Sequence, residues 1–170
     1  HTRWSGDWSS DVCSSDLGLR DRLKDYNKLG AKFTKWRGVY SISDQFPSKL
    51  SIVSNAHALA RYAALVQEAG MVPIVEPEIL MDGSHSSKTC YKKTSEVLQK
   101  CYEELELNKV DLKGTILKPN MILPGTDSKE KISNEEIAEL TVDCLKSNVP
   151  SEVPGIAFLS GGQSEIDSTA

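Results

Sequence analysis

The sequence contains no long hydrophobic run. A membrane-spanning helix needs about 20 consecutive apolar residues, and no stretch of this 170-residue chain approaches that length. The formal net charge is −4, and the basic residues are dispersed along the chain. A nucleic-acid-binding protein usually carries a concentrated basic patch. Neither a membrane nor a nucleic acid is therefore expected as a partner.

Histidine and cysteine are too few and too scattered to indicate a metal site. His57 and His85 lie far apart and have no potential ligand partner near them in the sequence. Cys90 and Cys101 are eleven residues apart, which on one helix is about 16 Å, too far for a disulfide. No metal ligand and no cofactor are expected. Unpaired thiols without metal-site spacing suit a reducing cytosol, so a cytoplasmic location is predicted.

Nucleotide-binding signatures are absent as well. No G-x-G-x-x-G or Walker pattern occurs, although such a fingerprint often follows the first strand of a doubly wound α/β protein. The sequence instead shows four short apolar segments that end in polar residues, at 31–37, 72–78, 114–118 and 155–162. Their spacing is nearly constant, with 41 residues from Lys35 to Glu76, 42 from Glu76 to Lys118 and 42 from Lys118 to Ser160. This regular interval indicates a repeated structural unit.

Helical periodicity fills the gaps between these segments. Apolar residues recur every three or four positions from Leu50 to Val66 and from Thr94 to Leu105. A third stretch opens at Ser133 with an N-cap and an acidic first turn. Strands and helices that alternate at a fixed period predict parallel βαβ units, and polar residues at the carboxyl end of every strand are typical of a (β/α)8 TIM barrel. The sequence therefore predicts an α/β fold with about four units of such a barrel, and a doubly wound open sheet is the alternative.

The predicted strand ends carry the side chains of a candidate active site. Lys118 ends an apolar strand, where desolvation favours the neutral, nucleophilic amine, and Lys35 would add a neighbouring positive charge. Glu76 is a candidate general acid or base, with Glu78 as a second carboxylate. A strand-end lysine can also simply extend into solvent. The common register of the strand ends favours the catalytic interpretation.

An anion site is predicted beside these residues. Successive backbone N–H groups of Ser160, Gly161 and Gly162 can converge on an anion, and Arg37 supplies positive charge for a phosphate. Ser164 and Glu165 are expected to begin a helix directed at the same anion. A serine–glycine turn alone is weak evidence, because most such turns bind no ligand.

Five collinear strings resemble class I, or Schiff-base, fructose-1,6-bisphosphate aldolases. They are GAKFTKWR at 30–37, NAHALARYA at 55–63, VPIVEPEILMDG at 72–83, LKPNM at 117–121 and PGIAFLSGGQS at 154–164. The resemblance implies a TIM barrel that needs no cofactor and reversibly cleaves fructose 1,6-bisphosphate to dihydroxyacetone phosphate and glyceraldehyde 3-phosphate in glycolysis. It also implies that the parent enzyme is a homo-oligomer.

The resemblance also implies roles for the candidate residues. In that family the counterpart of Lys118 forms an imine with the ketose, and the counterpart of Glu76 transfers protons beside the counterpart of Lys35. The counterparts of Arg37 and of residues 160–162 hold a substrate phosphate. Two other interpretations stay open at this stage. One is a Schiff-base lyase for another sugar phosphate, and the other is an inactive truncated fragment or a non-catalytic scaffold.

The resemblance covers only residues 18–170 and only the fourth to seventh of the family's eight βα units. Residues 1–17 show no periodic pattern, and the string from Asp7 to Leu17 matches the translation of a short-read sequencing adapter. This segment is therefore expected to be an artefact without a fold of its own. Residues 18–170 are predicted to form a partial barrel domain.

Overall fold

Three parallel strands form the sheet of the computed structural model, which describes residues 18–160 and 163–169. β1 (Phe33–Tyr40), β2 (Val72–Ile79) and β3 (Ile116–Leu117) lie side by side in chain order. The register pairs Arg37 of β1 with Glu76 of β2. The fourth predicted segment continues this order, because Ile156 forms a parallel bridge with Leu117 of β3.

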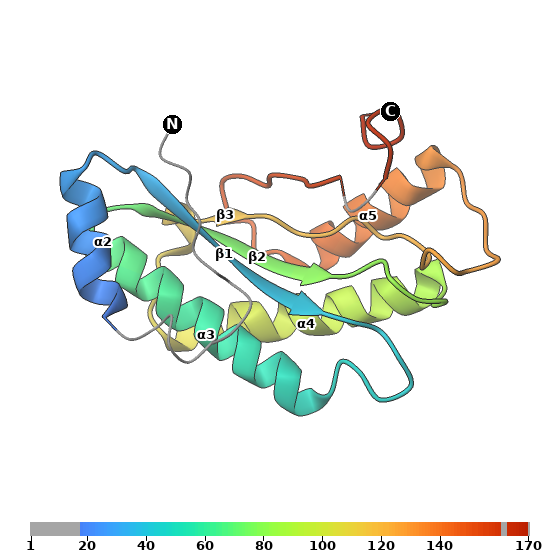
Figure 1. Cartoon of the computed structure of the whole chain (residues 1–170), viewed down its shortest axis with the longest axis horizontal. Helices are drawn as coiled ribbons and strands as arrows, with labels where there is room; N and C mark the ends of the chain where they lie inside the picture. The colour runs from blue at the N-terminus through green and yellow to red at the C-terminus, as the bar shows by residue number, and fades with distance from the viewer. Residues whose placement is uncertain (1–17, 161–162, 170) are drawn as a thin grey trace.

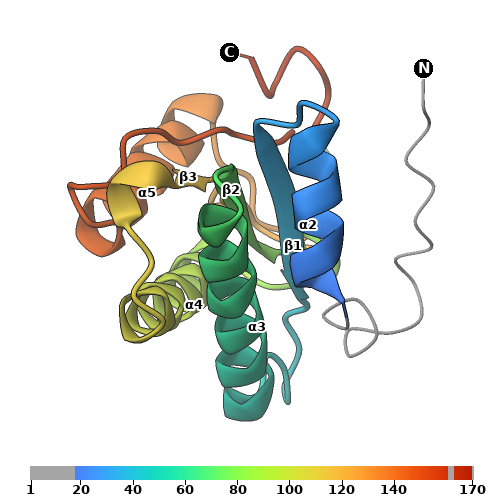
Figure 2. The same cartoon turned by 90° about the vertical axis from the view of Figure 1, so that its left-hand side faces the viewer.

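Helices connect consecutive strands and cover one side of the sheet (Figure 1). α3 (Lys49–Glu68) joins β1 to β2, α4 (Ser87–Leu107) and the 3-10 turn η1 (Leu112–Gly114) lead to β3, and α5 (Asn134–Asn148) follows. Because the strand order never reverses, right-handed crossovers place these helices on the same side. Figure 2 shows them in an arc outside the strands. A doubly wound sheet reverses its order and carries helices on both faces, so the barrel-type prediction is confirmed.

The core lies between the sheet and this helical layer. Leu59 of α3, Val75 of β2, Leu98 of α4 and Leu117 of β3 are each at most 2% exposed. The helix boundaries follow local chemistry. Ser133 accepts a hydrogen bond from the Glu136 N–H while the Glu136 side chain accepts one from the Ser133 N–H, a complete capping box at the start of α5. α3 and α5 therefore begin close to their predicted positions, whereas α4 begins at Ser87, seven residues before the predicted stripe.

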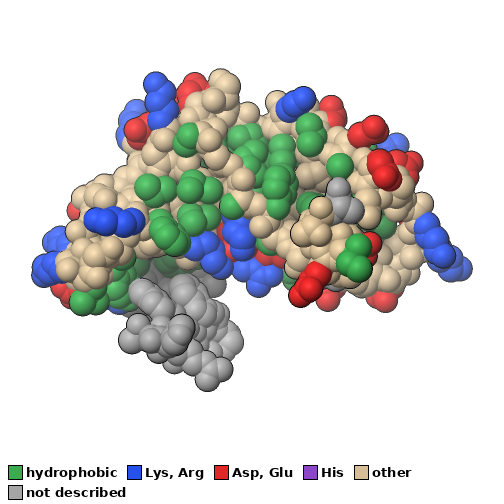
Figure 3. Space-filling model, turned by 90° about the horizontal axis from the view of Figure 1, so that it is seen from above, with side chains coloured by type: hydrophobic (Ala, Val, Ile, Leu, Met, Phe, Trp, Pro, Cys, Tyr) green, Lys and Arg blue, Asp and Glu red, His purple; other side chains and the backbone are tan. Residues whose placement is uncertain are grey.

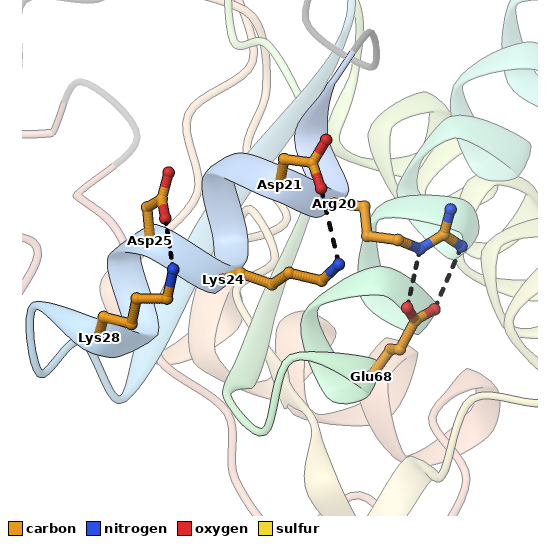
Figure 4. A network of polar contacts seen from close by, with 6 residues as sticks. All are labelled: Arg20, Asp21, Lys24, Asp25, Lys28 and Glu68. Carbon is orange, nitrogen blue, oxygen red and sulfur yellow. Dashed lines mark hydrogen bonds and ion pairs between the residues drawn. The ribbon is translucent and has the colours of Figure 1, made fainter.

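One helix of the structure, α2 (Leu19–Lys28), was not predicted. It buries Leu19 and Leu23 against the core. Its outer side carries the ion pairs drawn in Figure 4, including Arg20 Nε to Glu68 of α3 at 2.8 Å. These side chains are exposed, and exposed ion pairs contribute little to stability. α2 thus extends the outer helical layer and carries none of the predicted site residues.

Three details differ from the expectations. Leu50, predicted to face the core, is 76% exposed in the first turn of α3, and Ile52 is buried instead. The fourth strand is reduced to one bridge with two backbone hydrogen bonds, Leu117 N–H to the Gly155 carbonyl (3.1 Å) and Ala157 N–H to the Leu117 carbonyl (2.8 Å). No described neighbour pairs with its other edge. Residues 165–169 form turns in place of the expected helix.

The side of the sheet opposite the helices is open. Side chains alternate along β1, so Phe33, Lys35, Arg37 and Val39 project to this side while Tyr40 enters the core. Figure 3 looks onto this side and shows basic and acidic side chains beside one another, bordered by hydrophobic ones. In a closed barrel the corresponding side is the interior. The predicted segment 1–17, Gly161 and Gly162 lie outside the described residues.

Candidate active site

Glu76 lies at the centre of the candidate site. Its side chain is only 2% exposed, and each of its oxygens contacts a lysine. The Lys118 Nζ donates a hydrogen bond to Oε1 at 2.8 Å, and the Lys35 Nζ lies 2.8 Å from Oε2, an ion pair without hydrogen-bond alignment. A buried carboxylate is costly unless it is paired. The ammonium groups of Lys35 in β1 and of Lys118 directly after β3 offset that cost.

A second ion pair lies next to the first. The Arg37 Nε donates to the Oε2 of Glu78, and this hydrogen bond raises the pKa of the guanidinium. The Glu78 side chain is buried while the Arg37 side chain remains 46% exposed. The carboxylate therefore orients a guanidinium that stays accessible to a ligand.

Both pairs line one cavity of about 570 Å³ on the open side of the sheet, which extends past the end of β2 to Asp82. Its lining includes all six of the predicted site residues that the structure describes, namely Lys35, Arg37, Glu76, Glu78, Lys118 and Ser160. The volume is within the usual range for small-molecule pockets. The predicted side chains therefore converge, but the expectation that they end their strands was wrong for β1, which continues to Tyr40, and for Glu76, which is the fifth of the eight residues of β2. Gly161 and Gly162 cannot be placed, because they lie outside the described residues.

Comparisons with known proteins identify the family. The family model for class I fructose-bisphosphate aldolase matches residues 9–170. The chain belongs to the class I fructose-bisphosphate aldolase family. A probable class 1 aldolase of Xylella fastidiosa is 55% identical over 153 residues, which are 90% of this chain and 46% of that protein. Cytosolic aldolase 4 of Arabidopsis thaliana is 53% identical over 152 residues, covering 89% of this chain and 39% of that protein.

A solved aldolase structure has the same fold. The aldolase of Plasmodium falciparum, in a complex with TRAP and a small-molecule inhibitor, superposes with a TM-score of 0.89 at 45% identity. The match covers 90% of this chain and 45% of that one. The chain thus spans less than half the length of these family members.

Several cavity residues of this aldolase-family chain were not predicted from the sequence. Asn120, two residues after Lys118, lines the cavity, and Met81 and Thr126 lie in its wall. The wall consists of two loops joined through their backbones, with Gly125 N–H donating to the His85 carbonyl and Thr126 N–H to the Met81 carbonyl, both at 2.8 Å. Asn120 stands inside the string LKPNM, so its position beside Lys118 was the available signal. No feature of the sequence indicated that the two loops pair.

The histidines and cysteines of the described residues do not line the cavity described above, except for Cys90. Among residues 18–160 and 163–169, no group of three His, Cys, Asp or Glu side chains could hold a metal ion. The His57 Nδ1 lies 3.0 Å from the Oε2 of Glu104, a partner 47 residues away in the sequence. Cys90, Cys101 and Cys144 are buried and free, and Cys90 and Cys101 form no disulfide, as predicted. No helix in these residues is long and apolar enough to cross a membrane.

Proposed function

We propose that residues 18–170 carry the Schiff-base part of a class I fructose-1,6-bisphosphate aldolase site. The observation that supports this proposal is the Lys118 amine at 2.8 Å from the buried Glu76 carboxylate, inside a cavity that Lys35 and Arg37 also line. An amine beside a proton acceptor has the arrangement of an activated nucleophile. Membership of the aldolase family supplies the reaction class.

The proposed reaction begins with attack of the Lys118 amine on the C2 carbonyl of the ketose. Glu76 accepts the proton that the lysine nitrogen loses and delivers it to the carbinolamine oxygen, which leaves as water and gives an iminium ion. A base then takes the proton of the C4 hydroxyl, the C3–C4 bond breaks, and its electrons pass to the iminium nitrogen. Glyceraldehyde 3-phosphate departs, and the enamine of dihydroxyacetone phosphate is protonated at C3 and hydrolysed. The lysine supplies the electron sink, so the reaction needs no cofactor or metal.

The remaining residues are proposed to bind and orient the substrate. Lys35 holds the second oxygen of Glu76 and Glu78 orients Arg37. Arg37, Ser160 and the backbone of Gly161 and Gly162 are proposed to bind a phosphate group. A cytoplasmic location is proposed from the cytosolic Arabidopsis relatives, and a homo-oligomeric parent enzyme is proposed from the family resemblance.

Reductive trapping tests the proposal. Because the chain spans 46% of the Xylella fastidiosa aldolase, residues 18–170 would replace the matching part of that protein to give a chimera with all eight barrel units. Borohydride with dihydroxyacetone phosphate is expected to leave a covalent adduct on Lys118, located by peptide mass spectrometry. Lys118→Met should abolish both the adduct and cleavage. Lys113→Met, in the exposed turn η1, is the matched control and should change neither.

The outcomes separate the alternatives. An adduct on Lys35 or Lys113 with Lys118 unlabelled would overturn the assignment. An adduct on Lys118 with faster cleavage of another sugar phosphate would identify a different Schiff-base lyase.

A second candidate is a binding scaffold without catalysis, which the reported complex of the Plasmodium falciparum aldolase with TRAP favours. A correctly folded chimera that forms no adduct and cleaves no sugar phosphate would support the scaffold.

A further inference from the structure

The segment that carries Lys118 has little strand pairing of its own. β3 contains only Ile116 and Leu117. The Lys118 N–H donates to the Val75 carbonyl at 2.8 Å, and this is the last backbone bond to β2, because Pro119 has no N–H to donate. Backbone pairing therefore stops at the lysine itself. Another group must hold the chain where the side chain of Lys118 leaves the sheet.

The Asn120 side chain provides this attachment of the segment to β2. Its Oδ1 accepts a hydrogen bond from the Ile79 N–H at 3.0 Å, at the end of β2. This bond links the segment after Lys118 to the strand that carries Glu76, in the position where a backbone bond would continue the ladder.

The amide group of Asn120 completes the attachment. Its Nδ2 donates to the Thr94 Oγ1 of α4 at 3.1 Å and to the Met121 carbonyl at 3.0 Å. The orientation of the amide is fixed, because the Ile79 N–H requires an acceptor and the Met121 carbonyl requires a donor. Asn120 is 4% exposed and Thr94 is 2% exposed. Buried, fully paired polar groups of this kind specify one geometry.

We propose that Asn120 is a positioning residue that holds the Lys118 amine against Glu76. The proposal rests on the function proposed above, because it assigns to Asn120 the geometry of the nucleophile. Asn120 does not exchange protons with the substrate. It sets the direction in which Lys118 enters the cavity by fixing the backbone two residues later to β2 and α4.

Zero-length cross-linking of the full 170-residue chain measures this geometry directly. A water-soluble carbodiimide joins a carboxylate to an amine in contact with it, and Glu76 contacts two lysines at the same distance of 2.8 Å. Peptide mass spectrometry then gives the ratio of Glu76–Lys118 to Glu76–Lys35 product. Lys35 lies on β1, whereas the hydrogen bonds of Asn120 go to β2, α4 and Met121, so Lys35 is an internal reference. The measurement requires no substrate, so failure of imine trapping would leave its result unaffected.

Asn120→Ala is expected to lower the ratio roughly tenfold, the factor that follows when hydrogen bonding that holds the amine in place is lost. Thr94→Val keeps Asn120 and removes one of its partners, so it should lower the ratio by a smaller factor. Asn148→Ala is the matched control. Asn148 also donates to a carbonyl and a hydroxyl, of Cys144 and Ser95, but it joins α5 to α4 away from the cavity. It should leave the ratio unchanged.

Two results would overturn the proposal. One is an unchanged ratio in a folded Asn120→Ala chain, and the other is an equal fall in Asn148→Ala, which would show a general loss of stability. If Asn120→Ala fails to fold, both cross-links disappear together. Thr94→Val then decides, because an unchanged ratio in that variant would equally contradict a positioning role.

Discussion

Replacing Gly125 with alanine should open the wall of the cavity. A Cβ at this position would lie 2.1 Å from the Gly83 carbonyl oxygen and 2.6 Å from its carbon. These are backbone atoms, which cannot rotate away as a side chain can. The two loops must therefore separate, and Gly125 is required here because the two backbones approach so closely.

The cost follows from the contacts around Gly125. Three backbone hydrogen bonds join the loops, from the N–H groups of residues 125, 126 and 127 at 2.8, 2.8 and 2.9 Å. Losing two of them costs about 2 kcal/mol, and overpacking adds about 1 kcal/mol or more. A total of about 3 kcal/mol corresponds to roughly a hundredfold change in the local opening equilibrium.

Hydrogen exchange with mass spectrometry on peptides that cover residues 121–130 measures this opening. Exchange should accelerate by roughly that factor in Gly125→Ala. Gly155→Ala is the control, because a Cβ there meets no atom within 4 Å and its φ is not in the left-handed region. Equal exchange in the two variants would refute the reasoning from close backbone approach.

Three further predictions concern pH, catalysis and association. Burial lowers the pKa of His85 below its ordinary 6.5, and neither ring nitrogen has a hydrogen-bond partner. The buried neutral imidazole therefore contributes fully to the free energy of unfolding above pH 6.5, and this contribution declines as the pH falls below that value. Urea unfolding should therefore show a loss between pH 7.5 and 5.5 that is smaller in His85→Phe, and an identical loss would contradict this. Glu76→Gln in the chimera should lower kcat by about two to four orders of magnitude, whereas normal kcat with only a raised KM would assign Glu76 to binding. Residues 18–170 alone should associate and cleave no fructose 1,6-bisphosphate, because the side of the sheet that bears Phe33 is open, and a compact monomer with measurable cleavage would disprove this.

The parts of the fold that follow from short-range patterns were predictable. The helices over Leu50–Val66 and Thr94–Leu105 were evident because an apolar face repeats every three or four residues. The positions of the strands were evident from the apolar runs, but their ends were not, because β1 continues past Arg37 to Tyr40 and pairs there with the end of β2. α2 was missed because its apolar face is narrow, with Leu19 and Leu23 buried among charged neighbours.

Contacts between distant segments were not predictable. Nothing near Gly125 indicates that it meets Gly83, because the contact depends on how two loops fold against each other. The partners of Asn120 lie 26 and 41 residues away. The exposure of Leu50 was also not predictable from the apolar pattern. In the first turn of α3 the side chain that contacts the core is Ile52, and Leu50 faces solvent.

The depth at which each charge lies is the strongest physical argument for an anionic ligand. The side chains of Glu76 and Glu78 are 2% and 7% exposed, whereas those of Lys118, Lys35 and Arg37 are 27%, 43% and 46% exposed. The buried carboxylates of Glu76 and Glu78 therefore pair with the three cations, which lie nearer the solvent and can contact a ligand. The exposed Asp82 also lines the cavity, so its three cations are balanced by three carboxylates and the lining carries no net charge. The argument for a phosphate ester therefore rests on the accessible ammonium and guanidinium groups, which can donate charge-assisted hydrogen bonds to its oxygens, and the most enclosed of these cations is Lys118, the residue proposed as the nucleophile.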